Sequence, residues 1–248
     1  MIWNNIEGEI SRLPIMIRTG LLAGLALAAA APAAWAAPKI QFISKTTHEF
    51  KTVYQGTPVA YGFFFKNTGN QTLVIEKVQA DCGCTTARAV PEKMAPGAKG
   101  KISVIFDTFH YRGKQHKTVT ITTNDPHHEK VTLTLSGTVK VAVDIKPSPS
   151  IAMLTVVKSE KKTRTFTVVA LEPMKGFKVI KVEKAVPYIH VSAPRPSKKH
   201  KGGFDITVTL GPNAPVGRLG QDIIIHTNHK RQPKAAVRVW ANVVAERK

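Results

Sequence analysis

The chain has 248 residues, with 36 Lys and Arg against 16 Asp and Glu, which gives a formal net charge of +20 at pH 7. Its two cysteines lie in one tripeptide, Cys82-Gly83-Cys84, so no disulfide framework can join distant parts of the chain, and each domain must rest on its hydrophobic core. The sequence contains no Ser-His-Asp order, phosphate-binding loop or His-Glu-x-x-His motif, so we expect a protein that is not an enzyme and that holds no cofactor.

Residues 1–36 have the pattern of a secretory signal peptide that is removed from the mature protein. A basic residue precedes a continuous apolar run at residues 21–31, and Ala34-Trp35-Ala36 places small residues three and one before the cut. The apolar run is too short for a membrane span, so we expect no transmembrane anchor after cleavage. The pattern predicts a periplasmic or otherwise exported protein, and it leaves open whether Met1 or Met16 is the start.

Alternating apolar residues between turn residues predict about six or seven short strands, and no amphipathic helix, in residues 38–143. A change of phase at Val78 predicts a bulge. This pattern is typical of a β-sandwich of about 100 residues. The expected inward-facing residues are Val59, Tyr61, Phe63, Phe65, Leu73, Ile75, Ile102, Val104, Phe106, Val119, Ile121, Val131, Leu133 and Leu135.

The second half of the sequence repeats the first. A shift of 104 residues without a gap places Thr227-Asn228 on Thr123-Asn124, although it sets Phe63 against the polar Thr167. We therefore predict an all-β chain of two tandem Ig-like sandwiches, at residues 38–143 and 147–248. The proline-stiffened segment Pro147-Ser148-Pro149-Ser150 is predicted to link them.

The last strand of the first repeat, in residues 131–143, is long enough to be an exposed edge strand. Such an edge is a hazard for unwanted pairing, which Lys130 and Lys140 would reduce. Equally, a partner protein could add a strand there.

The charge is concentrated in the second repeat. Residues 37–143 contain 14 basic and 7 acidic side chains, whereas residues 144–248 contain 20 and 7. In an exported protein such charge would attract an unknown envelope protein or an anionic envelope component, unless it serves solubility alone. Nucleic acid is not expected, because no groove-reading motif is present. The basic clusters in expected loops are Lys161-Lys162, Lys198-Lys199 with Lys201, and Lys230-Arg231.

The first repeat contains a set of short motifs along its whole length: His48-Glu49-Phe50, Phe65-Lys66-Asn67-Thr68-Gly69-Asn70, Cys82-Gly83-Cys84-Thr85, Pro96-Gly97, Phe106-Asp107-Thr108 and Thr123-Asn124-Asp125-Pro126. With these motifs it resembles the bacterial domain-of-unknown-function 1573 family. The resemblance implies an exported protein with Ig-like sandwiches similar to the abnormal-spindle/hydin type, and it implies no activity. Two residues depart from the family pattern: Lys51 stands where a glycine is usual, and Asp81 replaces a usual serine. A lysine would be unfavourable at position 51 if that glycine has a positive φ.

Cys82 and Cys84 form the candidate site, as a possible disulfide or thiol pair, and three interpretations stay open. The sulfurs could be small buried groups or a local disulfide that pins a turn. They could form an easily reduced disulfide with a redox role. They could also bind copper or zinc as thiolates, which requires further ligands, and Met94 is the nearest in sequence. The repeat frame places Val186 and Tyr188 at the cysteine positions of the second repeat, so the fold does without them.

Charged and histidine residues near these positions give weaker indications. The negative charge of Asp81 would disfavour a thiolate and the positive charge of Arg88 would favour it; their distances from the sulfurs decide which effect is larger. The histidines at 127, 128, 226 and 229 are expected to be solvated loop residues. The function expected from the whole pattern is a non-catalytic exported binding or assembly module of the bacterial cell envelope. The alternative is a thiol-dependent redox or copper-handling protein that uses both cysteines.

Overall fold

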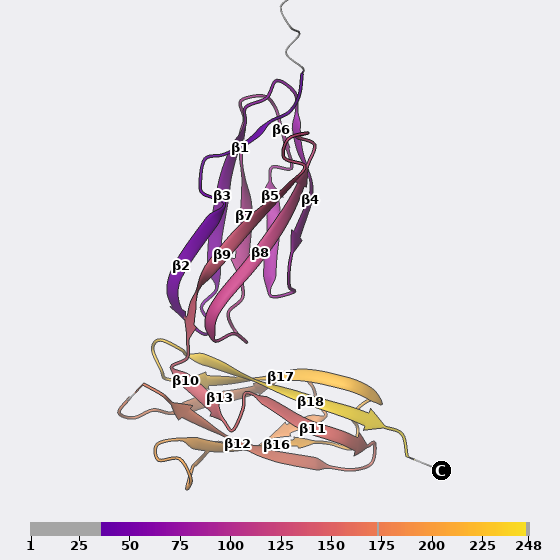
Figure 1. The fold of residues 1–248 in the computed structure, drawn as a ribbon. Helices are drawn as coiled ribbons and strands as arrows, with labels where there is room; N and C mark the ends of the chain where they lie inside the picture. Colours follow the sequence, from indigo (N-terminus) through magenta and orange to yellow (C-terminus); the bar gives the residue numbers. More distant parts are fainter. Residues whose placement is uncertain (1–35, 173, 247–248) are drawn as a thin grey trace, which may run out of the picture. The chain divides into compact units, whose positions relative to one another are not determined.

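The computed structural model describes residues 36–172 and 174–246, so the predicted signal peptide lies outside the described residues apart from Ala36. Regular structure in these ranges consists of eighteen β-strands (Figure 1). No helix in the described part of the chain is long and apolar enough to cross a membrane. The predicted all-β class is confirmed.

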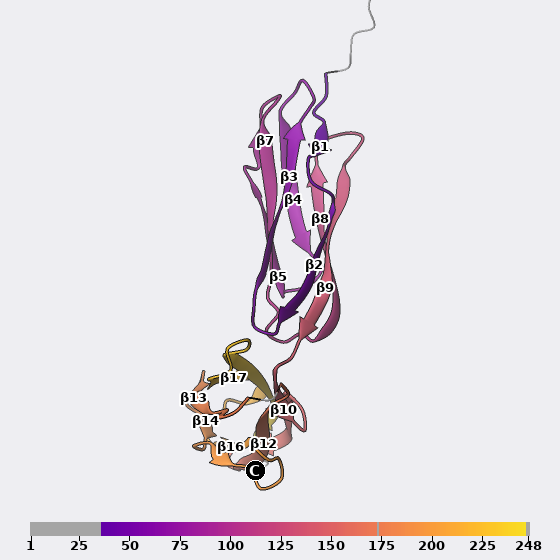
Figure 2. The same ribbon diagram turned by 90° about the vertical axis from the view of Figure 1, so that its left-hand side faces the viewer.

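Strands β1 to β9 form two sheets around one hydrophobic core, and we call them the first sandwich (Figure 2). One sheet has the order β1-β3-β7-β5 and the other the order β2-β9-β8-β4-β6. Phe63, Phe65 and Phe106 are fully buried between them. The strands are β1 (Ile40–Phe42), β2 (Thr47–Tyr54), β3 (Val59–Asn67), β4 (Leu73–Ala80), β5 (Thr85–Val90), β6 (Lys93–Met94), β7 (Lys99–Phe106), β8 (Gly113–Thr123) and β9 (Lys130–Lys140).

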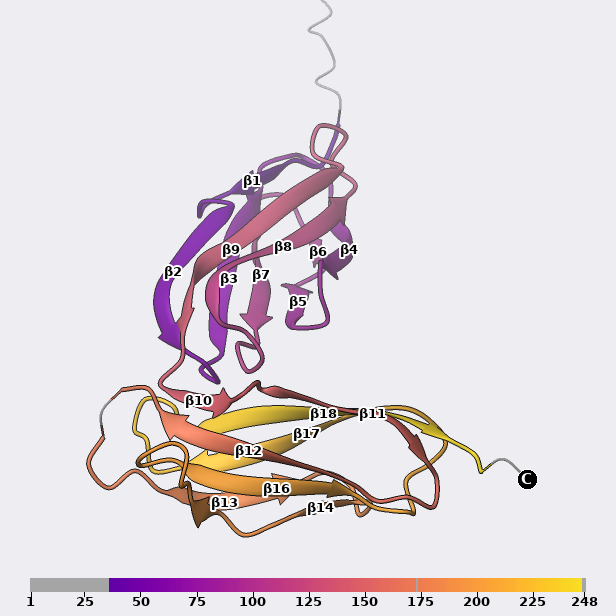
Figure 3. The same cartoon turned by 60° about the horizontal axis from the view of Figure 1, so that its bottom comes forward.

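Strands β10 to β18 form a second pair of sheets with a core of its own, the second sandwich (Figure 3). The sheet orders are β10-β12-β16-β14, with β15 beside β16, and β11-β18-β17-β13. Met153, Phe166 and Ile206 are buried in this core. The strands are β10 (Val143–Lys146), β11 (Ser150–Val157), β12 (Lys162–Ala170), β13 (Val179–Lys184), β14 (Ile189–Val191), β15 (Arg195–Pro196), β16 (Phe204–Leu210), β17 (Gly217–Thr227) and β18 (Lys234–Val244).

The alternation in the sequence matches the buried faces of the strands. Ile102, Val104 and Phe106 on β7 are all fully buried, and the residues between them are more exposed. The bulge expected near Val78 is present, because the pairing of β4 with β8 shifts register between Ile75 and Lys77. Period-2 alternation is a local property of one strand, which is why it can be recognised without knowing the strand's neighbours.

The two sandwiches repeat one topology, but the gap-free offset of 104 residues was wrong for the first strands. After the connection that follows β3 the offset is 104, because Val78 and Val182 take equivalent places in their sheets. Before that connection, Phe63 is equivalent to Phe166 and not to Thr167. The offset changes because 16 positions separate Phe166 from Val182, whereas 15 separate Phe63 from Val78, so the second repeat has one extra residue in this part of the chain.

Each sandwich has an edge strand with a bulge at a residue of positive φ. The φ angles are 55° at Lys51 on β2 and 61° at Leu154 on β11. Each bulge interrupts a parallel pairing, of β2 with β9 and of β11 with β18. Strand β9 therefore lies inside its sheet, between β2 and β8. The prediction that residues 131–143 form an exposed edge was wrong, since β2 covers that edge.

The proline-rich segment at residues 147–150 does not link the sandwiches as predicted. Strand β10 pairs with β12, and Ile145 on β10 is buried in the core of the second sandwich. The segment is therefore a turn between β10 and β11, inside the second sandwich. Only residues 141 and 142 separate β9 from β10. Proline marks a turn in a sequence, but it does not show which strands the turn joins.

Candidate functional site

The Cys82-Gly83-Cys84 turn carries the chain from one sheet of the first sandwich to the other. It joins β4 to β5, which belong to different sheets. The N–H of Thr85 donates to the carbonyl oxygen of Cys82 at 3.3 Å, and the N–H of Asp107 donates to that of Cys84 at 2.9 Å. Backbone hydrogen bonds thus form the turn and tie it to the end of β7.

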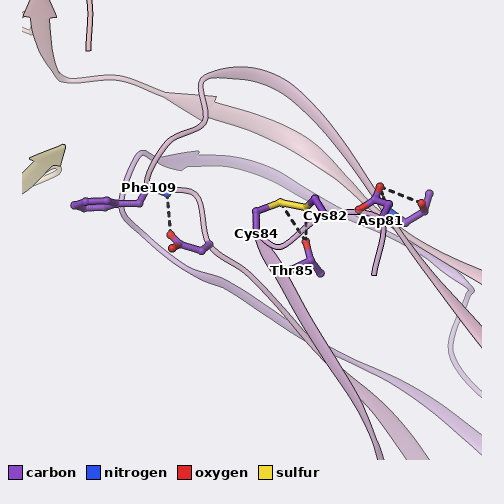
Figure 4. Close-up of a disulfide and its surroundings, with 7 residues drawn as sticks. Asp81, Cys82, Cys84, Thr85 and Phe109 are labelled. Atoms are coloured by element: carbon purple, nitrogen blue, oxygen red, sulfur yellow. Dashed lines mark hydrogen bonds between the residues drawn. A yellow bond between two sulfur atoms is a disulfide. The ribbon is translucent and has the colours of Figure 1, made fainter. Parts of the chain in front are cut away.

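The two cysteines are joined in a disulfide, with their Cα atoms 5.2 Å apart (Figure 4). The hydroxyl oxygen of Thr85 lies 3.6 Å from the Cys82 sulfur and 3.7 Å from the Cys84 sulfur. Both cysteines are half-buried, and Cys84 packs against the edge of the core. The sulfurs therefore sit under the sheet crossover, beside a buried threonine.

The arrangement gives no support to the metal interpretation of the cysteine pair. Met94 pairs with Leu73, at the opposite end of β4 from Cys82, and it is buried in the core. Seven residues of extended strand separate these ends by about 23 Å. Among the described residues, no group of three His, Cys, Asp or Glu side chains lies close enough together to hold a metal ion.

The side chain of Asp81 is hydrogen-bonded to a neighbouring strand. Its carboxylate accepts hydrogen bonds from the backbone N–H of Thr118 at 2.9 Å and from the Thr118 hydroxyl at 3.1 Å (Figure 4). Arg88 is exposed on β5, opposite Ser103. Asp81 therefore anchors the end of β4 to β8, which is a structural role that sequence reasoning did not identify.

The second sandwich forms the same turn without sulfur. The equivalent residues Val186, Pro187 and Tyr188 join β13 to β14. The N–H of Ile189 donates to the Val186 carbonyl at 3.4 Å, and the N–H of Gly211 donates to the Tyr188 carbonyl at 2.8 Å. Both hydrogen bonds repeat those of the cysteine turn. The disulfide is therefore an addition to a turn that forms without it, as the repeat comparison predicted.

The shared Thr-Asn pair also has a structural role in both sandwiches. The Asn124 amide oxygen accepts from the N–H of Val74 at 2.8 Å, and its amide nitrogen donates to the Thr72 carbonyl at 3.0 Å. Asn228 makes the equivalent two bonds, to Lys178 at 2.8 Å and to Gly176 at 2.7 Å. These bonds close the end of each sandwich, so this motif indicates the fold and not a binding site.

Asp125 is a buried carboxylate at the same turn. It accepts hydrogen bonds from the N–H groups of Ile40 and His127, each at 2.9 Å, and its Oδ2 lies 3.0 Å from Nδ1 of His128. Burial alone would raise the pKa of Asp125, but the hydrogen bonds from His127, Ile40 and His128 outweigh it and hold this pKa below its usual value. The ionised side chain thus ties the first strand to the turn.

The four histidines do not converge. His128 lies against Asp125, and His226 Nε2 lies 3.0 Å from a Glu183 carboxylate oxygen on the neighbouring strand. His226 lies within β17, and His229 is only 5% exposed, so the expectation of solvated loop residues was wrong for both positions. A turn residue can be buried when its loop folds over the end of a core, which the local pattern does not reveal.

The basic clusters of the second sandwich lie on exposed turns. Lys161 precedes β12, and Lys198, Lys199 and Lys201 lie in the loop that leads into β16. In the part of the chain that the structure describes, none of these four lysines forms an ion pair. Arg231, in contrast, donates to Glu172 at 2.8 Å. The lysine loops are therefore a cluster of available positive charge on this sandwich.

Solved structures that resemble parts of the chain include Ig domains and a PapD-like domain. A protein of unknown function from Porphyromonas gingivalis W83 is 13% identical, with a TM-score of 0.33, over 82% of this chain and 99% of that chain. The ASH / PapD-like domain of human CEP192 is 15% identical, with a TM-score of 0.35, over 43% and 88%. The structure of DIP-gamma IG1+IG2 is 14% identical, with a TM-score of 0.29, over 83% and 98%. Likeness at this level concerns the fold alone.

A family comparison is more specific for the first sandwich. No curated protein matches the chain. Residues 41–139 match the model of the family DUF1573, which is described as a protein of unknown function. This range runs from β1 to the end of β9, and it contains the turn motifs and the cysteine pair described above. The first sandwich therefore matches the DUF1573 family, which is the resemblance that its motifs indicated.

Proposed function

We propose that this chain is a non-catalytic exported module that binds an acidic partner in the bacterial cell envelope. The observation that carries the proposal is the unpaired positive charge on the exposed turns of the second sandwich. Residues 144–248 contain 20 basic side chains and only 7 acidic ones. The cysteine pair is an addition to a turn that the second sandwich forms without it, so no observation favours the thiol-dependent alternative.

Electrostatics at these loops favours an anionic partner over a neutral one. At physiological ionic strength the Debye length is about 8 Å, so each lysine cluster acts on what comes close to it and not on the whole surface. Three lysines within four residues, at positions 198, 199 and 201, form the densest cluster. A partner bound by such charge dissociates when salt is added.

The test measures the binding of residues 37–248 to two anionic probes, poly-L-glutamate and vesicles that contain anionic phospholipid, at low and high salt. A lysine near an anionic membrane surface contributes about 1 kcal/mol. Removing three should therefore weaken vesicle binding by about 100-fold. The test variant neutralises the loop cluster as Lys198→Gln, Lys199→Gln and Lys201→Gln, and the control neutralises three exposed lysines of the first sandwich as Lys93→Gln, Lys99→Gln and Lys101→Gln.

The control variant removes the same formal charge from a different place. If both triple variants weaken binding equally, net charge alone is responsible and the assigned loop is wrong. If neither probe binds at low salt, the proposed function is refuted.

A further inference from the structure

The second sandwich has an apolar hollow on its β11-β18-β17 sheet. We call it the Trp240 groove; its volume is about 450 Å³, and the residues that line it include Leu154, Leu219, Trp240 and Arg218. Leu154 is 64% exposed and Trp240 is 46% exposed. Hollows of this size are typical of ligand-binding sites, which range from about 300 to 1,000 Å³. Two large apolar side chains thus stand in solvent beside a cavity that they line.

The first sandwich shows that the fold does not require these apolar residues. In the second sandwich Ala152 pairs with Trp240, and at the same place in the first sandwich Glu49 pairs with Ser136. Leu154 lies in the β11 bulge, where the first sandwich has Lys51. Three polar positions of one sheet face have therefore become apolar in the duplicate: Glu49 corresponds to Ala152, Lys51 to Leu154 and Ser136 to Trp240. The two sheets have the same topology, so the requirements of folding do not explain the exposed apolar residues of the second sandwich.

The charged residues around the groove indicate whether its partner is acidic or basic. Arg238 lies with its guanidinium carbon 5.6 Å from the Trp240 ring centre, and Asp222 neutralises it through two hydrogen bonds of 2.7 Å. Arg218 lines the groove and forms no ion pair with any described residue. The lining contains no acidic side chain. A second copy of this chain, with its formal charge of +20, would be repelled, so the occupant is acidic.

The open edge of strand β11 indicates that the bound partner is an extended segment. Strand β11 pairs with β18 on one side and, within the described residues, with no strand on the other. An open edge of this kind can accept an extended segment through backbone hydrogen bonds, and alternate side chains of that segment then enter pockets on one face. Leu154 belongs to both the edge and the groove, so one extended segment can use both.

We propose that the Trp240 groove binds an extended acidic peptide segment of a partner protein. One apolar side chain of this segment fills the groove against Trp240 and Leu154, and a carboxylate two positions away, on the same face of the extended segment, meets Arg218. The inference rests on the proposed function and adds the surface and the chemistry of the partner. The sheet edge and the groove act together, so binding needs acidic and apolar residues two positions apart and not negative charge alone.

The sequence provides a reporter at this site. The chain has three tryptophans, and Trp240 is the only one within residues 37–248. The intrinsic fluorescence of residues 37–248 therefore reports on the groove alone. The probes are capped nine-residue peptides in which leucine and acidic residues take turns at the odd positions with serine between them, so that both kinds of side chain lie on one face of the extended peptide, together with versions that carry lysine for every acidic residue or serine for every leucine. We expect only the acidic and apolar peptides to bind and to shift Trp240 emission to shorter wavelength.

Two variants transfer the residues of the first sandwich into the groove. Trp240→Ser and Leu154→Lys each introduce the residue that occupies the equivalent place in the first sandwich, and Lys51 shows that lysine is compatible with the positive φ at that place. Binding, measured by calorimetry because Trp240→Ser removes the reporter, should fall at least about tenfold in each. The matched control is Ile180→Ser on β13, where the replaced side chain is 68% exposed and does not line the groove.

The outcomes separate this inference from the proposed function. If the variants bind the acidic peptides as tightly as the unchanged chain does, the groove is not the site and the inference is overturned. It is equally overturned if anionic phospholipid vesicles shift Trp240 emission and no peptide does, since the occupant is then a membrane surface. Poly-L-glutamate binding that depends on the lysine loop but not on Trp240 would leave the proposed function intact. The absence of any anion binding would refute both.

Discussion

Removal of the Cys82–Cys84 disulfide should destabilise the first sandwich only moderately. The perturbation is the double replacement Cys82→Ser with Cys84→Ser. The cysteines are separated by two positions in sequence, so the bond closes a loop of three residues. The chain-entropy relation for such a loop gives about 1.6 kcal/mol at 25 °C, compared with about 4.7 kcal/mol for a loop of 100 residues. For a domain of about 100 residues this corresponds to a fall in Tm of roughly 6–13 °C.

The equivalent turn of the second sandwich explains why no larger loss is expected. Val186 and Tyr188 hold that turn through the same two backbone hydrogen bonds, so the replaced turn keeps its geometry. The assay is urea unfolding followed by far-UV circular dichroism, with Trp240 fluorescence as an internal reference in the second sandwich. The Trp240 transition should not move. A loss of more than about 4 kcal/mol, or a first sandwich that does not fold, would refute the reasoning, because the turn would then depend on its disulfide.

Three further predictions concern the first sandwich. Lys51→Gly should raise the urea midpoint and increase the free energy of unfolding by about 0.5–1 kcal/mol, because glycine adopts the positive φ at this position without strain. An unchanged midpoint would contradict this. The folded-state pKa of Asp125 is lowered, so its stabilising effect is present above its unfolded pKa near 3.8 and is lost as the pH falls through the folded pKa. Asp125→Asn should therefore lose about 2 kcal/mol at pH 7 and show a weaker acid transition in circular dichroism than the unchanged chain, whereas an equal transition would contradict the assignment. Gly100→Ala should cost about 1–3 kcal/mol in the same urea assay, because the added methyl carbon would lie 2.6 Å from the sulfur of buried Met94; no loss would show that the core adapts.

The strands could be predicted from the sequence because their signal is local. Phe63, Phe65 and their partners alternate within one strand, and the duplication supplied a second copy of the same pattern. The one-residue change of offset was signalled by the poor match of Phe63 with Thr167, which is a neighbour of its true equivalent Phe166. A shift by one residue turns every side chain of a strand to the other face. A polar residue aligned with a buried apolar one therefore indicates that the alignment of the repeats is shifted by one residue.

The order of the strands could not be predicted, because pairings join residues far apart in the sequence. Nothing near residues 131–143 shows that β2 covers their edge, and nothing near Pro147 shows that β10 already belongs to the second core. The cysteine pair was recognised as a site of interest, but its state required coordinates. The Trp240 groove was missed although the signal was present: a comparison of the repeats position by position shows polar residues replaced by apolar ones.

The parallel pairing of β2 with β9 has a consequence for when the chain can fold during its synthesis. Thr47 near the start of the first sandwich pairs with Thr134 near its end, and Ser150 pairs with Arg238 in the second. Neither sheet can therefore be completed until its last long strand has been synthesised, and topologies with such distant contacts fold slowly. A delay of this kind keeps the nascent chain unfolded until the last long strand of each sandwich is available, so the first and last strands of a sandwich must find each other in one late step.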